Sequence, residues 1–118
     1  MVENTHKRED RFVITHQTTT GRQTYSISLS AEDVPELVLA LEKGGRVATG
    51  YTIEAFLIAL SESGDPPWAR ELDFDSEASR CTVRCARREP LRRLADRLAR
   101  RLANQRAARR LVEGLPRE

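Results

Sequence analysis

The chain has 118 residues and a mass of 13.4 kDa, which suits one domain able to bury a core without a metal or disulfide staple. Charged residues make up 32% and hydrophobic residues 39%, a composition that excludes wholesale intrinsic disorder. No apolar run approaches the roughly 18 residues of a membrane helix, and the polar N-terminus has no signal-peptide core. We therefore expect a cytoplasmic protein.

Two stretches near the N-terminus predict a β-hairpin. After a flexible polar leader at residues 1–10, the stretch RFVITHQ alternates, with Phe12, Ile14 and His16 on one face. TTTGR supplies a turn, and TYSISLS then alternates again. Alternation on both sides of a Gly-containing turn is typical of a hairpin. We expect one domain over residues 11–118.

Two helices are expected next. Asp33 followed by Glu36 resembles a capping box, and apolar residues recur at helical spacing until the glycine pair at 44–45. The segment RVATG is then a link, with a short strand as the alternative. A second helix is expected to begin at Thr52 and to end near Ser61–Gly64. The two prolines of GDPPW predict a loop after it, without regular structure.

A second hairpin and a long helix complete the pattern. ELDFD and RCTVRCA alternate around the turn SEAS, and Phe74 falls on the face opposite Asp73 and Asp75. An amphipathic helix follows, with a shorter segment from Ala107 to Glu113. We expect an α+β domain in which the two hairpins form one antiparallel sheet covered by helices. The long C-terminal helix should pack on the sheet through a leucine stripe, Leu91, Leu94, Leu98 and Leu102.

The segment DFDSEA carries carboxylates at alternate positions, Asp73, Asp75 and Glu77. A calcium loop of the EF-hand type would need glycine where Ala78 stands and glutamate where Arg84 stands. A catalytic carboxylate pair would need an enclosing cleft to separate the two pKa values, which a short hairpin does not supply. The remaining interpretations are the polar outer side of a hairpin and an acidic surface that faces a partner.

The two cysteines indicate neither a disulfide nor a metal site. On a strand, Cys81 and Cys85 lie roughly 13 Å apart at about 3.3 Å per residue, beyond the reach of a disulfide. Their spacing relative to His6 and His16 does not match a zinc motif. We expect both thiols in the core. No phosphate loop, dinucleotide motif or nucleophile motif occurs either, so we expect no cofactor, no metal and no catalytic site.

Charge is distributed unevenly along the chain. Residues 1–83 hold 14 acidic and 8 basic side chains, whereas residues 84–118 hold 12 basic and 4 acidic ones. The Arg-rich C-terminal helix favours one alternative function, a nucleic-acid-associated or regulatory module. Against it, no aromatic residue follows Phe74 and no helix-turn-helix pattern is visible. The plainer interpretation is a solvated helix face behind a core stripe, so nucleic acid is not the expected partner.

Two stretches in this order resemble immunity protein family 51 of bacterial polymorphic toxin systems. They are GYTIEAF at 50–56 and LDFDSEASRCTV at 72–83, followed by LRRLADRLARRLAN. The resemblance covers roughly residues 44–103. Positions that match the family pattern are Gly50, Tyr51, Glu54, Phe74, Asp75, Glu77 and Ala78. Ile53 stands where the family tends to have Trp, and Ser76 where Pro is common. If that Trp contacts the toxin, this chain has a different target or contact.

The resemblance implies a binding protein rather than an enzyme. Such proteins are small cytoplasmic α+β domains that bind and block a toxin encoded beside them, and an acidic surface would steer this one onto a basic toxin such as a nuclease. Trp68, in its loop, would be either a lid over the edge of the core or an anchor for the partner. The expected partner-binding residues are Tyr51, Glu54, Trp68, Asp73, Asp75 and Glu77.

Overall fold

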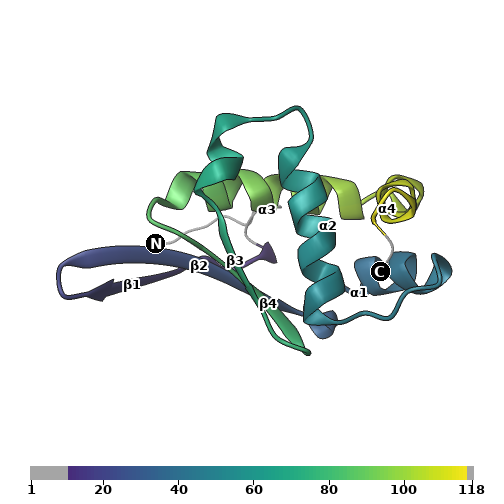
Figure 1. Cartoon of the computed structure of the whole chain (residues 1–118), viewed down its shortest axis with the longest axis horizontal. Helices are drawn as coiled ribbons and strands as arrows, with labels where there is room; N and C mark the ends of the chain where they lie inside the picture. The colour runs from purple at the N-terminus through teal and green to yellow at the C-terminus, as the bar shows by residue number, and fades with distance from the viewer. Residues whose placement is uncertain (1–10, 117–118) are drawn as a thin grey trace.

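The computed structural model describes residues 11–116, so the leader predicted at residues 1–10 lies outside the described part of the chain. Its regular elements are four strands, four α-helices and two short 3-10 helices (Figure 1). In chain order they are β1 (Thr15–Thr19), β2 (Arg22–Ser30), η2 (Ala31–Asp33), α1 (Pro35–Lys43), α2 (Gly50–Glu62), η3 (Pro67–Glu71), β3 (Asp73–Ser76), β4 (Arg80–Cys85), α3 (Arg88–Leu102) and α4 (Gln105–Glu113).

Both predicted hairpins form, and they join into one sheet. The strand order is β1-β2-β4-β3 with every neighbouring pair antiparallel. Val83 of β4 lies opposite both Ile27 of β2 and Phe74 of β3, so a single row of apolar side chains crosses β2, β4 and the edge strand β3. The expected α+β class and the single antiparallel sheet covered by helices are therefore confirmed.

Helices lie on one side of the sheet (Figure 1). Helices α2 and α3 pack directly on β2 and β4, while α1 and α4 pack against each other beside them. Alternate residues of β2 and β4 are buried beneath these helices, and the residues between them, such as Ser28 and Arg84, point to the open face. The hairpin of β1 and β2 extends beyond the helices, so all five residues of β1 are exposed.

The long helix α3 packs as its leucine stripe predicts. All four leucines are buried, and Ala95 and Ala99 are buried beside them, which allows the helix to approach the sheet closely. The second C-terminal segment is also helical, but it begins at Gln105 rather than Ala107, because Asn104 caps it by accepting from the Ala107 amide at 3.1 Å. The stripe residues are Leu91, Leu94, Leu98 and Leu102.

Several local predictions are wrong. The capping box is formed by Ser30 and Asp33 and caps η2, whereas Glu36 binds Arg11, which lies 25 residues away in the chain. The first strand begins at Thr15, after Phe12 has already turned into the core, so the predicted strand starts too early. The pairing of Glu36 with Arg11 and the burial of Phe12 are long-range contacts, which local spacing does not report.

The segments that flank α2 also differ from expectation. The link RVATG contains no strand, and α2 begins at Gly50, two residues before the predicted start at Thr52. The loop predicted at GDPPW contains the start of η3, because Pro67 occupies the first position of a 3-10 turn, where a missing amide costs nothing. Trp68 therefore belongs to a short helix.

Candidate functional site

The first turn of α2 rests on the turn between β3 and β4. The Gly50 amide donates to the carbonyl oxygen of Ala78 at 3.0 Å, and a Cβ on Gly50 would stand 1.9 Å from the carbonyl oxygen of Glu77. Thr49 caps the helix by accepting from the Thr52 amide at 3.1 Å. This junction brings Tyr51, next to Gly50, to the same part of the surface as Glu77.

Tyr51 is the exposed aromatic residue of this junction, with 58% of its surface accessible. Val47, in the link before α2, is 73% accessible, and its carbonyl oxygen accepts from the Thr52 hydroxyl at 2.8 Å. Tyr51 and Val47 are close in sequence, and exposed apolar side chains of this kind anchor protein partners. The sequence analysis missed Val47, because a lone valine in a link carries no signal.

Glu54 follows one turn later, but it serves the fold. Its carboxylate accepts a short hydrogen bond from the hydroxyl of Ser76 on β3, and both side chains are half-buried. This contact ties α2 to the edge strand of the sheet. Glu54 is thus an expected partner-binding residue that is engaged within the fold.

Three carboxylates continue the surface along β3 and its turn. Asp73 and Asp75 point away from the helices, as predicted, and Glu77 is exposed in the turn. Arg84 of β4 donates to Asp75 at 3.0 Å, and both side chains stay partly exposed to water. Within residues 11–116, neither Asp73 nor Glu77 makes an ion pair.

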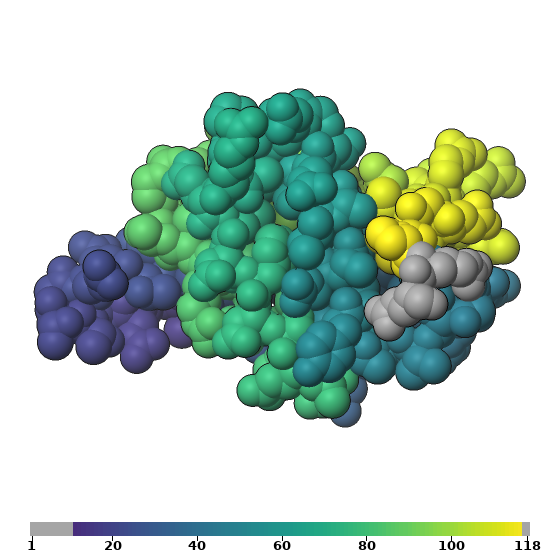
Figure 2. Space-filling view, in the orientation of Figure 1, coloured from purple at the N-terminus to yellow at the C-terminus, as the bar shows by residue number. Residues whose placement is uncertain are grey.

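The elements that carry these residues lie side by side. Figure 2 shows α2, η3 and β3 together across the middle of the view, between the β1–β2 hairpin and α4. The segment 50–79 that builds this region carries seven acidic side chains and one basic one. We call Val47, Tyr51, Asp73, Asp75 and Glu77 the acidic surface; its apolar centre is Val47 and Tyr51.

Trp68 lies apart from the acidic surface. It follows the C-terminal end of α2, whereas Tyr51 stands at the N-terminal end of this 13-residue helix, about 18 Å away along the axis. The Trp68 ring is half-buried, and the guanidinium carbon of Arg97 on α3 stands 5.0 Å from its centroid. Of the two alternatives for Trp68, this position matches the lid over the edge of the core.

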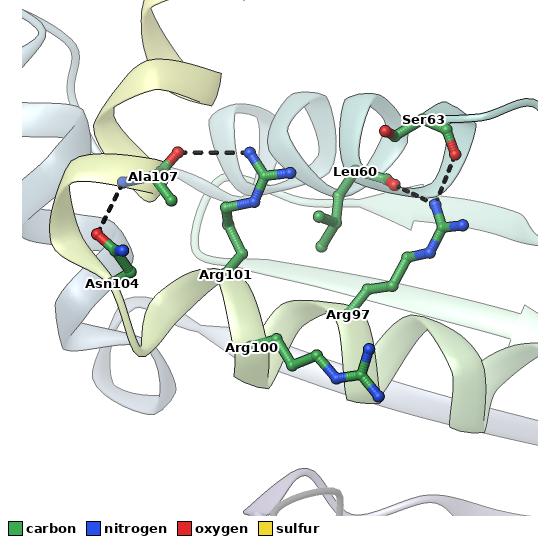
Figure 3. Close-up of a pocket in the computed structure, with 7 residues that line it drawn as sticks. All are labelled: Leu60, Ser63, Arg97, Arg100, Arg101, Asn104 and Ala107. Atoms are coloured by element: carbon green, nitrogen blue, oxygen red, sulfur yellow. Dashed lines mark hydrogen bonds between the residues drawn. The ribbon is translucent and has the colours of Figure 1, made fainter.

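A second feature is a pocket of about 330 Å³ where α2, α3 and α4 meet (Figure 3). Arg97 reaches from α3 to the end of α2 and donates to the carbonyl oxygens of Leu60 at 3.0 Å and Ser63 at 2.8 Å. Arg101 turns toward α4 and makes a weak bond to the Ala107 carbonyl oxygen at 3.4 Å. The lining residues are Leu60, Ser63, Arg97, Arg100, Arg101, Asn104 and Ala107.

The two cysteines and His16 are packed against other parts of the fold. Cys81 and Cys85 are free and buried, and burial raises the pKa of the Cys81 thiol to about 11, which leaves it protonated at neutral pH. His16 lies on the exposed strand β1 and stacks on Tyr25 with ring centroids 4.6 Å apart. Cys81 is therefore no candidate nucleophile.

Two further properties concern residues 11–116 as a whole. Over this range, no cluster of His, Cys, Asp or Glu side chains is arranged to hold a metal ion. None of the helices described there combines the length and apolar character that crossing a membrane requires.

Comparison of the chain with protein-family models, with curated proteins and with solved structures finds no match in any of the three.

Proposed function

We propose that this protein neutralises a bacterial toxin in the cytoplasm by binding it directly in a one-to-one complex. The observation that carries the proposal is that the exposed Tyr51 follows Gly50, whose backbone touches that of the exposed Glu77 in the β3–β4 turn. The resemblance of the stretches 50–56 and 72–83 to immunity protein family 51 supports the same function. Gly50 joins those two stretches in space, since its amide binds the Ala78 carbonyl oxygen.

The two parts of the acidic surface have different roles in the proposal. Tyr51 and Val47 supply apolar area that is lost from water on binding, and therefore affinity. Asp73 and Glu77 are exposed and bear charges that no ion pair within residues 11–116 neutralises, so they attract a basic toxin such as a nuclease and raise the association rate.

Co-expression with the toxin encoded beside this protein tests the proposal, together with calorimetric titration of the two purified proteins. We expect survival of the cells and binding that weakens as salt rises. Tyr51→Ala should weaken binding roughly 30-fold, the loss typical of an anchor residue. The double variant Asp73→Asn/Glu77→Gln should slow association and flatten the salt dependence, with little effect on dissociation.

The matched control is the double variant Glu32→Gln/Glu42→Gln, which removes the same charge from exposed positions on η2 and α1. It should change association less than the variant in the acidic surface does. A purified pair that does not associate at low salt would overturn the proposal. If the two double variants slow association equally, net charge and not the acidic surface determines the association rate. That result would overturn the assignment of the surface.

A further inference from the structure

The pocket between α2, α3 and α4 concentrates positive charge without a matching negative charge. Three guanidiniums line it, Arg97, Arg100 and Arg101, and no carboxylate does. Arg100 is paired with Asp96 outside the lining, at 2.8 Å. Arg97 and Arg101 stand four residues apart on α3, a spacing at which like charges repel each other on a helix. An anion in the pocket would relieve this repulsion.

The hydrogen bonds of the two central arginines orient them and leave donors free. Arg97 uses only Nη1 for the carbonyl oxygens at the end of α2, and its guanidinium stacks over Trp68. Arg101 uses only Nη1, for Ala107. Within residues 11–116, Nε and Nη2 of both groups therefore have no acceptor. That edge of a guanidinium is the fork that binds two oxygens of one phosphate group.

The wall of the pocket formed by α4 also favours an anion. Ala107 lies in the first turn of α4, so the positive end of that nine-residue helix faces the pocket. The volume of about 330 Å³ is at the lower end of the range for small-molecule sites, about 300 to 1,000 Å³, and exceeds the space that one phosphate group fills. Leu60 supplies an apolar wall for the rest of a ligand.

We propose that this pocket binds a small phosphomonoester, with its phosphate group on the free Nε and Nη2 edge of Arg101 and with the Arg97 guanidinium adding positive charge from the other wall. Arg100, which is 71% exposed, adds long-range attraction at the entrance. A second cluster of arginines, on α4, does not provide a comparable site, because all its residues come from one helix. The phosphate pocket is independent of the proposed toxin binding, since it lies at the opposite end of α2 from Tyr51.

The test is thermal unfolding of the full chain with inorganic phosphate, glycerol 3-phosphate or a single-stranded oligonucleotide, each balanced with sodium chloride to equal ionic strength. We expect saturable stabilisation by both phosphates, because a ligand that binds only the folded state raises its stability. Glycerol 3-phosphate should bind more tightly than inorganic phosphate, because it also contacts Leu60. Stabilisation by the oligonucleotide alone would overturn the proposal in favour of non-specific charge attraction.

Variants assign the effect to the pocket. Arg101→Gln should weaken phosphate binding by about tenfold or more, since it removes a charge-assisted pair of hydrogen bonds. Arg101→Lys should retain only part of the affinity for phosphate, because an ammonium group lacks the fork. Arg100→Gln, at an exposed position that cannot disturb folding, should give a smaller loss. Arg22→Gln, on the distant β-hairpin, is the control, and equal losses in Arg22→Gln and Arg101→Gln would refute the site.

Discussion

Gly50 and Glu77 touch backbone to backbone: a Cβ added to Gly50 would lie 1.9 Å from the Glu77 carbonyl oxygen and 2.4 Å from that of Arg80. Both obstacles are backbone atoms that cannot rotate away. Gly50→Ala should therefore separate α2 from the β3–β4 turn and cost about 2 to 3 kcal/mol of unfolding free energy, within the range for overpacking. Urea unfolding, monitored by circular dichroism, measures this loss of stability.

Gly114→Ala is the matched control for this substitution. Gly114 also lies at a helix end, but its φ is −86° and an added Cβ would meet nothing closer than the Leu111 carbonyl oxygen at 3.6 Å. Alanine there should be neutral or slightly stabilising, since it restricts the unfolded chain. If the two alanine variants unfold at the same urea concentration, the close approach at Gly50 does not exist in solution.

The core beneath α3 makes a second prediction. Leu98 is 2% exposed in the middle of the leucine stripe, so Leu98→Ala should cost about 2 to 5 kcal/mol through lost burial and the cavity left behind. Leu39 on α1 is 44% exposed, and Leu39→Ala should change stability by only about 0.5 kcal/mol. Thermal unfolding of both variants distinguishes them, and similar costs would contradict the packing of α3 on the sheet.

Patterns that depend on neighbouring residues predicted the fold well. The alternation in TYSISLS and RCTVRCA located β2 and β4 because one side of each strand is buried and the other is open. The leucine spacing located α3 for the same reason, with a helical period. Asp75 and Phe74 point to opposite faces, so DFDSEA does form the polar outer side of a hairpin, and its contact with a partner stays a prediction.

Features that depend on distant residues could not be found in this way. Arg97 belongs to a run of arginines that suggests a solvated helix face, yet it is half-buried and bonded to the end of α2. The same run hides the pocket, because its walls come from three helices. Tyr51 and Glu77 are 26 positions apart, and only the glycine at position 50 hinted that a backbone would approach there.

The contact of Arg97 with Trp68 makes a third prediction. Arg97 holds the end of α2 through two carbonyl oxygens and covers the ring, so Arg97→Gln should cost about 1 to 2 kcal/mol. Trp68 is the single tryptophan of the chain, so its fluorescence reports the change directly, with a shift to longer wavelength as water reaches the ring. Arg92→Gln, on the exposed side of α3, should leave the spectrum unchanged; a spectrum that is likewise unchanged in Arg97→Gln would contradict the stacking.

The pair of Arg11 and Glu36 makes the fourth prediction. Two hydrogen bonds, at 2.6 and 2.9 Å, join the guanidinium to the carboxylate, and they hold the pKa of Glu36 below its ordinary value of 4.5. A lowered pKa means that the stabilisation is present above the unfolded pKa and is lost as the pH falls through the folded pKa. The pair is partly exposed, so its contribution at neutral pH is about 1 kcal/mol at most.

Urea unfolding of Glu36→Gln at neutral and at acidic pH measures this contribution. The variant should be less stable than the parent chain at neutral pH, and the gap should close once the parent carboxylate is protonated. Glu42→Gln, at an exposed position on the same helix, should show no gap at either pH. A gap of constant size in Glu36→Gln would mean that the side chain acts through packing and not through its charge.

The buried thiol of Cys81 makes the last prediction. Its pKa is raised from 9.0 to about 11, chiefly by burial and in smaller part by the charges of Glu54 and Asp75. A thiol whose folded pKa is raised stabilises the fold fully below the unfolded pKa, and this stabilisation is lost as the pH rises through the folded pKa. Unfolding free energy should therefore fall above pH 9.0 by more in the parent chain than in Cys81→Ala, which has no thiol there to ionise.

Alkylation provides an independent measurement of the same thiol. With iodoacetamide at about pH 8, Cys81 should stay unmodified in the folded protein and react quickly in urea, because only the exposed thiolate attacks the reagent. Digestion and mass spectrometry separate it from Cys85, which is also buried and serves as the internal comparison. Rapid labelling of Cys81 without denaturant would show that β4 opens readily, which is incompatible with its central position between β2 and β3.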